Sequence, residues 1–447
     1  MRNVVQWFVN AGRTLAVLFI AFVFGVMYGF ARLGTLFIFN KEKRRKAVAR
    51  VRGRILRWAM TVLGASFVKL GQVMSTRPDI FAPEMIDELR LLQDKLPAFR
   101  FGKVREQIEG DLGGKLEDHF RQLDETPIAA ASVAQVHRGN LVDGREVAVK
   151  ILRPKVRAKA ERDGIILVGF AKFLELVSKK ARLSEPVAHM RNFVDGIIGQ
   201  TDLRNESKNY IAFKQNFAKV PKVHFPDVYE DKSSERVLTM EFCRGKKVDG
   251  LGAGDHRDVA KIMRNAFLKM CFEDGFVHAD LHPGNMLVSD DRQLVVFDVG
   301  LVKHLGDDVL LQFIDFSRCI AMGTADDFIT HLKRFHKYLA SVDWNAVTVD
   351  AETLVTKFRK QSNSQLEWGS FINEVFAMAR KYAIRPIPEL ALVMVGLLTA
   401  EGIGKMLDPT NNTFNDIAVF VLPIAMKKGL VNPAAMAQAA RPQVAAS

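Results

Sequence analysis

Cysteine is scarce in this chain, and its scarcity excludes several classes of protein. The 447 residues hold three, Cys243, Cys271 and Cys319, an odd number with wide spacing. A secreted disulfide scaffold is therefore not expected, and a reducing compartment is favoured. The sequence has no CxxC pair, which argues against a thiolate zinc site. With 48% apolar and 26% charged residues it is neither collagen-like nor disordered, and its length suits two domains.

Acidic residues are almost absent from the first 60 positions. This segment holds one, Glu42, beside twelve Lys or Arg, whereas the formal net charge of the whole chain is +14. The remaining residues are therefore close to neutral, and the positive charge is a local feature. A basic surface spread over the molecule is not predicted, so nucleic acid is not an expected partner.

The positive charge of this segment lies on both sides of a long uncharged run. Eighteen residues without a charge separate Arg13 from Arg32, and the basic cluster KEKRRK follows at 41–46. A bilayer core is spanned by roughly 20 apolar residues. The positive-inside tendency then places everything from residue 41 onward in the cytoplasm, and the cluster should attract anionic headgroups. We predict a single-pass anchor in the bacterial inner membrane, with the mitochondrial inner membrane as the alternative.

Two other interpretations of this segment stay open: a helix lying in the membrane interface, and a cleaved presequence. A signal peptide has an apolar region of roughly 7–15 residues followed by a small-residue cleavage site. The run here is longer, and Arg32 follows it without such a site. Apolar stretches at 390–400 and 417–426 are shorter than a span, which suits buried core helices better.

Periodicity indicates a strand-rich part between two helical parts. Residues 41–125 have helical spacing. Two β-like stretches follow at 133–142 and 146–152, joined by the hairpin signal Asp143-Gly144. The later pattern is helical at about 155–217, a short strand at 237–242, and mostly helix after that, interrupted at 294–300.

The most informative motif is HADLHPGN at 278–285, followed by FDVG at 297–300. Pro-Gly favours a turn that would bring Asp280 near Asn285, and Asp298 ends an apolar strand-like run. Phosphoryl transfer needs such a set: a carboxylate near the nucleophile, and a carboxylate with an amide oxygen to hold Mg²⁺. Two alternatives stay open, a capped turn without further function and a transition-metal site of His278, Asp280 and His282.

An upstream lysine strengthens the phosphoryl-transfer interpretation. Lys150 ends EVAVK on the second predicted hairpin strand, like the strand lysine that contacts nucleotide phosphates in kinases. Such a lysine needs an acidic partner on a helix, and Glu206 is the candidate. The segment 237–243 is placed to link two lobes and to bind adenine through its backbone.

Two features depart from an ordinary protein kinase. The segment 128–137, IAAASVAQVH, stands where a glycine-rich loop is usual, so that glycine's conformational freedom is missing. Residues 300–316 contain no Ser, Thr or Tyr, and no A-P-E segment follows, so a phosphorylated activation loop is not expected.

These ordered motifs resemble the UbiB family of atypical, protein-kinase-like proteins, also called AarF-domain proteins. The resemblance runs from about residue 60 to 410. The segment 66–99 resembles the family's KxGQ segment, with Lys69, Gly71 and Gln72 in the signature places. AAAS at 129–132 resembles its Ala-rich loop, and HADLHPGN and FDVG resemble its catalytic and metal-binding loops.

The resemblance implies a kinase-like fold in which the KxGQ helices fold over the active site. It also implies binding of ATP with Mg²⁺, ATP hydrolysis rather than phosphorylation of other proteins, and support of ubiquinone or other isoprenoid-lipid metabolism. The implied partners are a membrane with anionic lipids and quinone-biosynthesis proteins or isoprenoid lipids.

The resemblance further assigns a role to each matching residue. Asp280 is the expected catalytic aspartate, and Asn285 and Asp298 are the expected Mg²⁺ ligands. The expected ATP-binding residues are Ala129, Ala130, Ala131, Ser132, Val133, Lys150 and Glu206, together with Glu241 and Cys243, which are included for their position in the linking segment 237–243 and not for the resemblance. The expected regulatory cover contains Lys69, Gln72 and Asp202.

One position departs from the family pattern. Members commonly have Glu-x-Asp just before the paired glutamate, and here the sequence is Gln200-Thr201-Asp202. If that Glu normally meets the KxGQ lysine, Lys69 loses a charged partner. A charge-assisted hydrogen bond is roughly twice as strong as a neutral one, so the cover should be held less firmly.

The predicted class is α+β: a two-lobed, protein-kinase-like fold with an N-terminal helical extension and an N-terminal transmembrane helix. Two functions are carried forward. One is a membrane-anchored Mg²⁺-dependent ATPase or small-molecule or lipid kinase, and the other is a pseudokinase-like scaffold gated by nucleotide. The expected domains are a membrane anchor (1–40), a basic juxtamembrane segment with the KxGQ extension (41–125), a nucleotide-binding N-lobe (126–245), a catalytic and metal-binding C-lobe (246–430) and a disordered tail (431–447).

Overall fold

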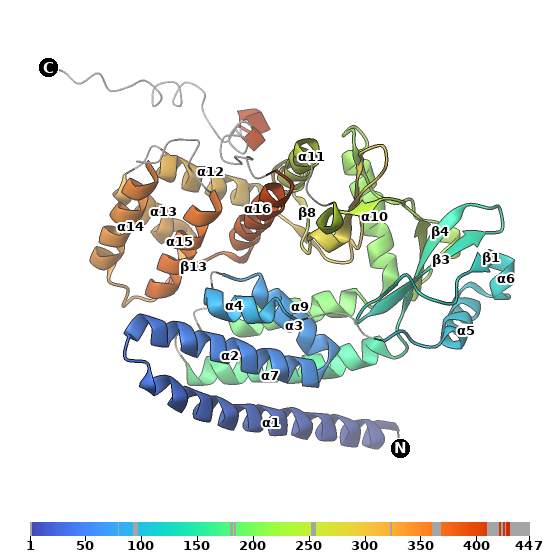
Figure 1. Ribbon diagram of the computed structural model, residues 1–447, viewed down its shortest axis with the longest axis horizontal. Helices are drawn as coiled ribbons and strands as arrows, with labels where there is room; N and C mark the ends of the chain where they lie inside the picture. Colours follow the sequence, from blue (N-terminus) through green and yellow to red (C-terminus); the bar gives the residue numbers. More distant parts are fainter. Residues whose placement is uncertain are drawn as a thin grey trace. The chain divides into compact units, whose positions relative to one another are not determined.

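The computed structural model divides the chain into two compact units (Figure 1). The N-terminal unit comprises residues 1–211 and 226–242, and the C-terminal unit comprises 212–225 and 243–447. The tail predicted at 431–447 and part of the apolar stretch at 417–426 lie outside the described residues. The described residues are 2–78, 80–92, 97–178, 182, 185–251, 256–321, 324–359, 368–408, 420, 421, 423, 424 and 426–429.

An antiparallel sheet forms the centre of the N-terminal unit. Val147, Val149 and Ile151 alternate along strand β4 (Glu146–Leu152) and lie on one face, where they pack against Val104 and Ile108 of helix α5 (Phe101–Leu112). The turn between β3 and β4 has Gly144 at φ +90°, a conformation that glycine adopts without strain. The strand order is β1 (Phe120–Leu123), β3 (Ala134–Leu141), β4 (Glu146–Leu152) and β6 (Val237–Glu241), with β2 (Ala129–Ala130) paired to β3 and α5 spanning Phe101–Leu112.

Helices make up the rest of this unit. Their shared apolar cluster contains Met60 and Leu63 of α2, Phe67 of α3 and Leu167 of α7, with Val17 of α1 packed against it. The basic segment after residue 40 therefore continues as an ordered helix against the rest of the unit. The helices are α1 (Arg2–Gly34), α2 (Lys41–Leu63), α3 (Ala65–Ser75), α4 (Pro83–Leu89), α6 (Leu116–His119), α7 (Val156–Val177), α9 (Pro186–Gly199) and α10 (Leu203–Phe217), the last shared with the C-terminal unit.

The predicted strands at 133–142, 146–152 and 237–242 are confirmed, and so is the hairpin turn. The prediction of helix throughout 41–125 is wrong at β1, which pairs with β3 through an irregular register. Its four residues bury only Phe120 and Leu123. Such a short edge strand becomes extended because β3 supplies hydrogen-bond partners, which local periodicity does not reveal.

The C-terminal unit combines short strands with a helical bundle. A four-stranded sheet has the order β5 (Val223–His224), β10 (Leu294–Val296), β9 (Met286–Val288) and β7 (Lys246–Lys247). Strand β8 (Phe276–His278) pairs separately with β11 (Val302–His304), and these two pairings position the HADLHPGN and FDVG segments. The helices are α11 (Arg257–Leu268), α12 (Asp307–Ala321), α13 (Ala325–Phe335), α14 (Trp344–Arg359), α15 (Trp368–Tyr382) and α16 (Pro388–Leu407).

Helix α16 is a core helix of this unit. Leu390, Val393 and Leu397 are buried, and a Cβ on Gly396 would come within 2.0 Å of the Phe267 ring of α11. Glycine is therefore needed where the two helices meet. Among the described residues, α16 is the one helix long and apolar enough to cross a membrane, yet 56% of its apolar window is buried inside the protein. The core-helix prediction for 390–400 is confirmed, and the span predicted before residue 40 stays a prediction.

Candidate active site

The residues predicted to act on nucleotide fall into two groups, one in each unit. Lys150, Glu206 and the Ala-rich loop belong to the N-terminal unit. Asp280, Asn285 and Asp298 belong to the C-terminal unit.

Lys150 and Glu206 form a buried ion pair. The Lys150 Nζ lies 2.8 Å from each carboxylate oxygen of Glu206, and the two side chains are 15% and 4% exposed. Lys150 is on β4, where a strand of buried valines fixes its direction, and Glu206 is in the first turn of α10. Burial makes such a pair costly unless both charges are satisfied. The predicted partner of Lys150 is therefore confirmed, and the pair holds the ammonium in one orientation.

The Ala-rich loop is a tight turn between β2 and β3. The Ala131 N–H donates to the Ala134 carbonyl over 2.8 Å, so it is used inside the turn. Ser132 is 4% exposed, and its Oγ has no hydrogen-bond partner within the described residues. A buried hydroxyl without a partner is costly, and such a group is often satisfied by a ligand or water. Ser132 is thus the loop side chain best suited to meet a bound molecule.

Arg153 supports this loop, a role that no sequence motif predicts. Its Nε donates to the Ala131 carbonyl over 2.7 Å, and its guanidinium also donates to the Pro97 carbonyl over 3.0 Å. Arg153 therefore ties the loop to the segment that follows the KxGQ helices. An Arg three residues after the strand lysine is not a recognisable motif, so only the structure identifies it.

Lys69 of the KxGQ segment reaches the residue that departs from the family pattern. Its Nζ donates to Gln200 Oε1 at 2.5 Å, whereas Gln72 Nε2 contacts the Leu92 carbonyl at 3.5 Å. Asp202 bonds instead to Arg204, whose guanidinium lowers the pKa of that carboxyl below its ordinary value. Lys69 and Gln200 are therefore partners, and Asp202 has a separate role at the start of α10, where its Oδ1 accepts the Arg204 N–H at 3.1 Å.

The proposed adenine-binding segment leaves β6. Glu241 is paired with β4, and its N–H donates to the Asp227 carbonyl at 2.8 Å. That N–H is therefore used within the protein. Cys243 is half-buried and begins the second stretch of the C-terminal unit, 243–447.

His278 organises the loop that carries Asp280. Its Nδ1 accepts the Asp280 N–H at 3.1 Å, and its Nε2 lies 3.4 Å from the Phe297 carbonyl. These contacts require the neutral tautomer with the proton on Nε2. Burial lowers the pKa of His278, which agrees with a neutral ring. His278 thus connects the Asp280 loop to the FDVG segment.

Asn285 and Asp298 have the chemistry of Mg²⁺ ligands. Asn285 donates through Nδ2 to the Asp280 carbonyl at 3.1 Å, so its amide oxygen is the atom suited to a metal. Asp298 has φ +59°, a conformation costly for residues other than glycine and common at functional sites. The carboxylate and amide oxygens fit a hard cation. The hydrogen bond from Asn285 to the Asp280 carbonyl also closes a turn, as the capped-turn alternative expected.

A zinc site at this motif is disfavoured by the ring nitrogens. His278 and His282 each accept a backbone N–H at Nδ1, from Asp280 and Gly284 respectively. His278 also points its other nitrogen at a carbonyl. Its ring is therefore committed to holding the loop.

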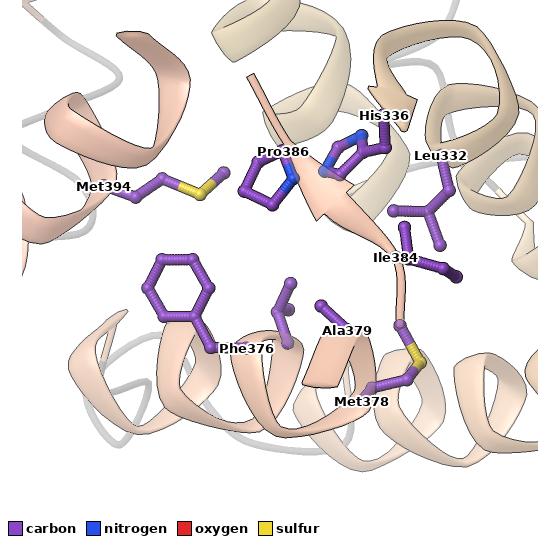
Figure 2. Close-up of a pocket in the computed structure, with 9 residues that line it drawn as sticks. Leu332, His336, Phe376, Met378, Ala379, Ile384, Pro386 and Met394 are labelled. Atoms are coloured by element: carbon purple, nitrogen blue, oxygen red, sulfur yellow. The ribbon is translucent and has the colours of Figure 1, made fainter. Parts of the chain in front are cut away.

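The bundle that follows contains a small apolar cavity of about 10 Å³ (Figure 2). A cavity of this size is at the limit for one water molecule. His336 is the polar group on a wall otherwise formed by residues such as Phe376, Pro386 and Met394. The cavity is too small to hold a nucleotide or a lipid.

Comparisons with known proteins agree with this geometry. Residues 91–326 match the ABC1 atypical kinase-like domain, and residues 351–412 match the UbiB helical domain. The chain belongs to the UbiB family. The chain is 32% identical over 400 residues to a probable protein kinase UbiB from Pseudomonas fluorescens, with 84% of this chain and 72% of that protein covered.

Other UbiB relatives show the same extent of similarity. A probable protein kinase UbiB from Glaesserella parasuis is 31% identical over 379 residues, covering 79% of this chain and 67% of the relative.

A solved complex of Rv3197 with erythromycin from Mycobacterium tuberculosis has a TM-score of 0.54 and 22% identity, covering 77% of this chain and 89% of that one. This likeness shows a shared fold, and the match to the ABC1 atypical kinase-like domain identifies that fold as protein-kinase-like.

Proposed function

We propose that this UbiB-family chain is a membrane-associated ATPase, or a kinase acting on a lipid or other small molecule, that binds ATP with Mg²⁺. In this proposal it supports ubiquinone or other isoprenoid-lipid metabolism, and residues 1–40 attach it to the membrane. The proposal rests on the ion pair between Lys150 and Glu206, in which Nζ lies 2.8 Å from each carboxylate oxygen. Kinases need this pair in place to hold the nucleotide phosphates.

The remaining roles follow from the chemistry of the side chains. Asn285 and Asp298 would supply oxygen ligands to Mg²⁺, whose charge balances that of the phosphates. Asp280 would orient the attacking hydroxyl or water, because its loop is held by His278 and Asn285. Ser132 and Lys150 would contact the phosphates. The acceptor is a small molecule or water in this proposal.

A second candidate is a scaffold that uses nucleotide binding without turnover. The use of the Ala131 N–H inside its own turn favours it, because that group is then withdrawn from the phosphates. The scaffold would assemble quinone-biosynthesis proteins through a nucleotide-dependent surface.

The deciding experiment is Mg²⁺-dependent ATP hydrolysis by the full chain, with vesicles of phosphatidylcholine alone or mixed with phosphatidylglycerol. Asp280→Asn and Asp298→Asn are measured beside it, together with ATP-dependent thermal shift. An enzyme should lose at least about a hundredfold in turnover in both variants. If ATP still raises the melting temperature of a chain that never hydrolyses it, the scaffold function is supported instead.

A further inference from the structure

Helix α1 carries a continuous apolar stripe on its exposed side. Six large apolar residues recur at intervals of three or four positions and are between 43% and 71% exposed. This spacing places them on one face of a helix. The opposite side packs inward, where Val17 and Ile20 contact the apolar cluster of the unit. The stripe consists of Leu15, Phe19, Phe22, Val26, Phe30 and Leu33.

A second stripe lies on the exposed side of α7. Ile165, Phe170, Phe173, Leu176 and Val177 are between 55% and 77% exposed. The buried residues of the same helix include no aromatic side chain and one acidic one: Ala160, Asp163, Gly164, Leu167 and Ala171. A surface helix ordinarily has the reverse distribution, with its large apolar residues inside. Exposed apolar groups gathered in this way mark a surface that is covered by something else.

The two stripes belong to neighbouring helices of one unit. Leu167 of α7 lies in the same apolar cluster as Met60 and Leu63 of α2, and Val17 of α1 packs against that cluster. Figure 1 shows α1, α2 and α7 running along the same region of the N-terminal unit. This layer of helices therefore presents exposed apolar side chains from two of its members, α1 and α7.

The charge of α2 decides which occupant fits this layer. This helix carries nine Lys or Arg and one acidic residue, Glu42, and Lys43, Arg45 and Arg50 are exposed. A second copy of the chain would bring the same positive charge to the contact and be repelled. Anionic headgroups are attracted by such a helix, and apolar side chains beside it enter the acyl boundary.

We propose that α7 is a second membrane contact, and that α1 and α7 lie together in the interface of an anionic bilayer. The α2 basic residues would then meet the headgroups. This inference rests on the membrane association in the proposed function and is independent of nucleotide turnover. It differs from a spanning anchor, because α1 keeps its packing against α2 and enters only the outer part of the bilayer.

Site-specific labels on the full chain test the proposal. Leu176→Cys on α7 and Phe30→Cys on α1 each take an environment-sensitive NBD label. Val349→Cys on α14 is the matched control, since Val349 is an exposed apolar residue, 61% exposed, in the C-terminal unit. The unsubstituted chain is labelled in parallel to measure any reaction at Cys243. Vesicles contain phosphatidylcholine with or without phosphatidylglycerol, and spin-labelled lipids quench at the headgroup or at the acyl-chain end.

The expected result is a blue shift at positions 30 and 176 with anionic vesicles, quenched more by the headgroup spin label, and no shift at 349. Phe173→Ser with Leu176→Ser should weaken vesicle flotation about tenfold or more, because two apolar side chains no longer enter the bilayer. Val349→Ser should leave flotation unchanged. ATP-dependent thermal shift, unchanged in these variants, shows that they are folded.

Four results would overturn the proposal. A shift at position 30 alone would mean that α1 holds the membrane without α7. A further label at Phe22→Cys, midway between Arg13 and Arg32, separates the two arrangements of α1: quenching there by the acyl-end label alone would mean that α1 spans the bilayer. A shift at 176 that appears without vesicles and grows with protein concentration would identify a second copy as the occupant. If the chain does not float at all, membrane association fails, while ATP hydrolysis in the same samples reports separately on the enzyme.

Discussion

Lys69 donates a hydrogen bond of 2.5 Å to the neutral amide oxygen of Gln200, so the KxGQ lysine is held without a carboxylate. Both side chains are half-buried, on α3 and just after α9. Family members commonly have a glutamate here, which would make this contact an ion pair. If the family glutamate meets the KxGQ lysine, this chain keeps the contact without its charge–charge attraction.

We predict that Gln200→Glu stabilises the contact between Lys69 and residue 200. A hydrogen bond to a charged group contributes about 1 kcal/mol more than a neutral one, so the free energy of unfolding should rise by about that amount. Urea titration measures it. Lys69→Met serves as the control background, in which Gln200→Glu should bring no gain, and an equal gain in both backgrounds would contradict the prediction.

Breaking the buried pair at the nucleotide-binding strand should be costly. Lys150→Met leaves the Glu206 carboxylate, 4% exposed, without its ammonium partner. The expected loss is about 3 kcal/mol of unfolding free energy. Lys150→Met with Glu206→Leu should recover most of it, because the pair is replaced by apolar groups. Denaturant unfolding compares the unfolding free energies of the wild type, the single variant and the double variant. ATP should fail to raise the melting temperature of either variant.

Replacing Asp298 by glycine should raise stability and abolish activity. Its positive φ is costly for an aspartate, so Asp298→Gly should raise the free energy of unfolding by up to about 1 kcal/mol while abolishing Mg²⁺-dependent ATP hydrolysis. Asp298→Asn keeps a residue that tolerates this conformation and should lose activity without gaining stability. A glycine variant less stable than the wild type would show that the carboxylate also has a structural role.

The histidines of the helical bundle predict acid sensitivity. Burial lowers the pKa of His336 to about 3, with His331 adding to the effect, and burial also lowers the pKa of His331. An unfolded histidine titrates near 6.5, so below that pH the unfolded state binds more protons and stability falls. We expect a loss of roughly 1–2 kcal/mol between about pH 7 and pH 5.

His336→Gln provides the comparison for this pH dependence. The amide has no proton to bind in this range, so the stability of the variant should fall less steeply with acidification than that of the wild type. Urea unfolding at several pH values measures both slopes. Identical slopes would mean that other groups cause the acid sensitivity.

Much of the candidate site was predictable because its signals are local. Lys150 follows a run of alternating valines, and Asp280 and Asn285 are separated by a turn that Pro-Gly favours. The partner of Lys150 was also predicted, since an acidic residue on a helix was needed. Arg153 and His278 were not assigned their contacts, because each acts through backbone carbonyls that lie far away along the chain.

The sequence by itself determined the order of the motifs, the type of the main strands and helices, and the family. All three can be read from the order and spacing of residues along the chain, which do not depend on how the chain folds. The tertiary structure alone decided that Lys69 meets Gln200 and that the Ala131 N–H is used within its own turn. It also decided that large apolar residues of α7 face outward. Exposure and hydrogen-bond partners depend on which elements pack against one another, and a helical repeat only says which residues share a face.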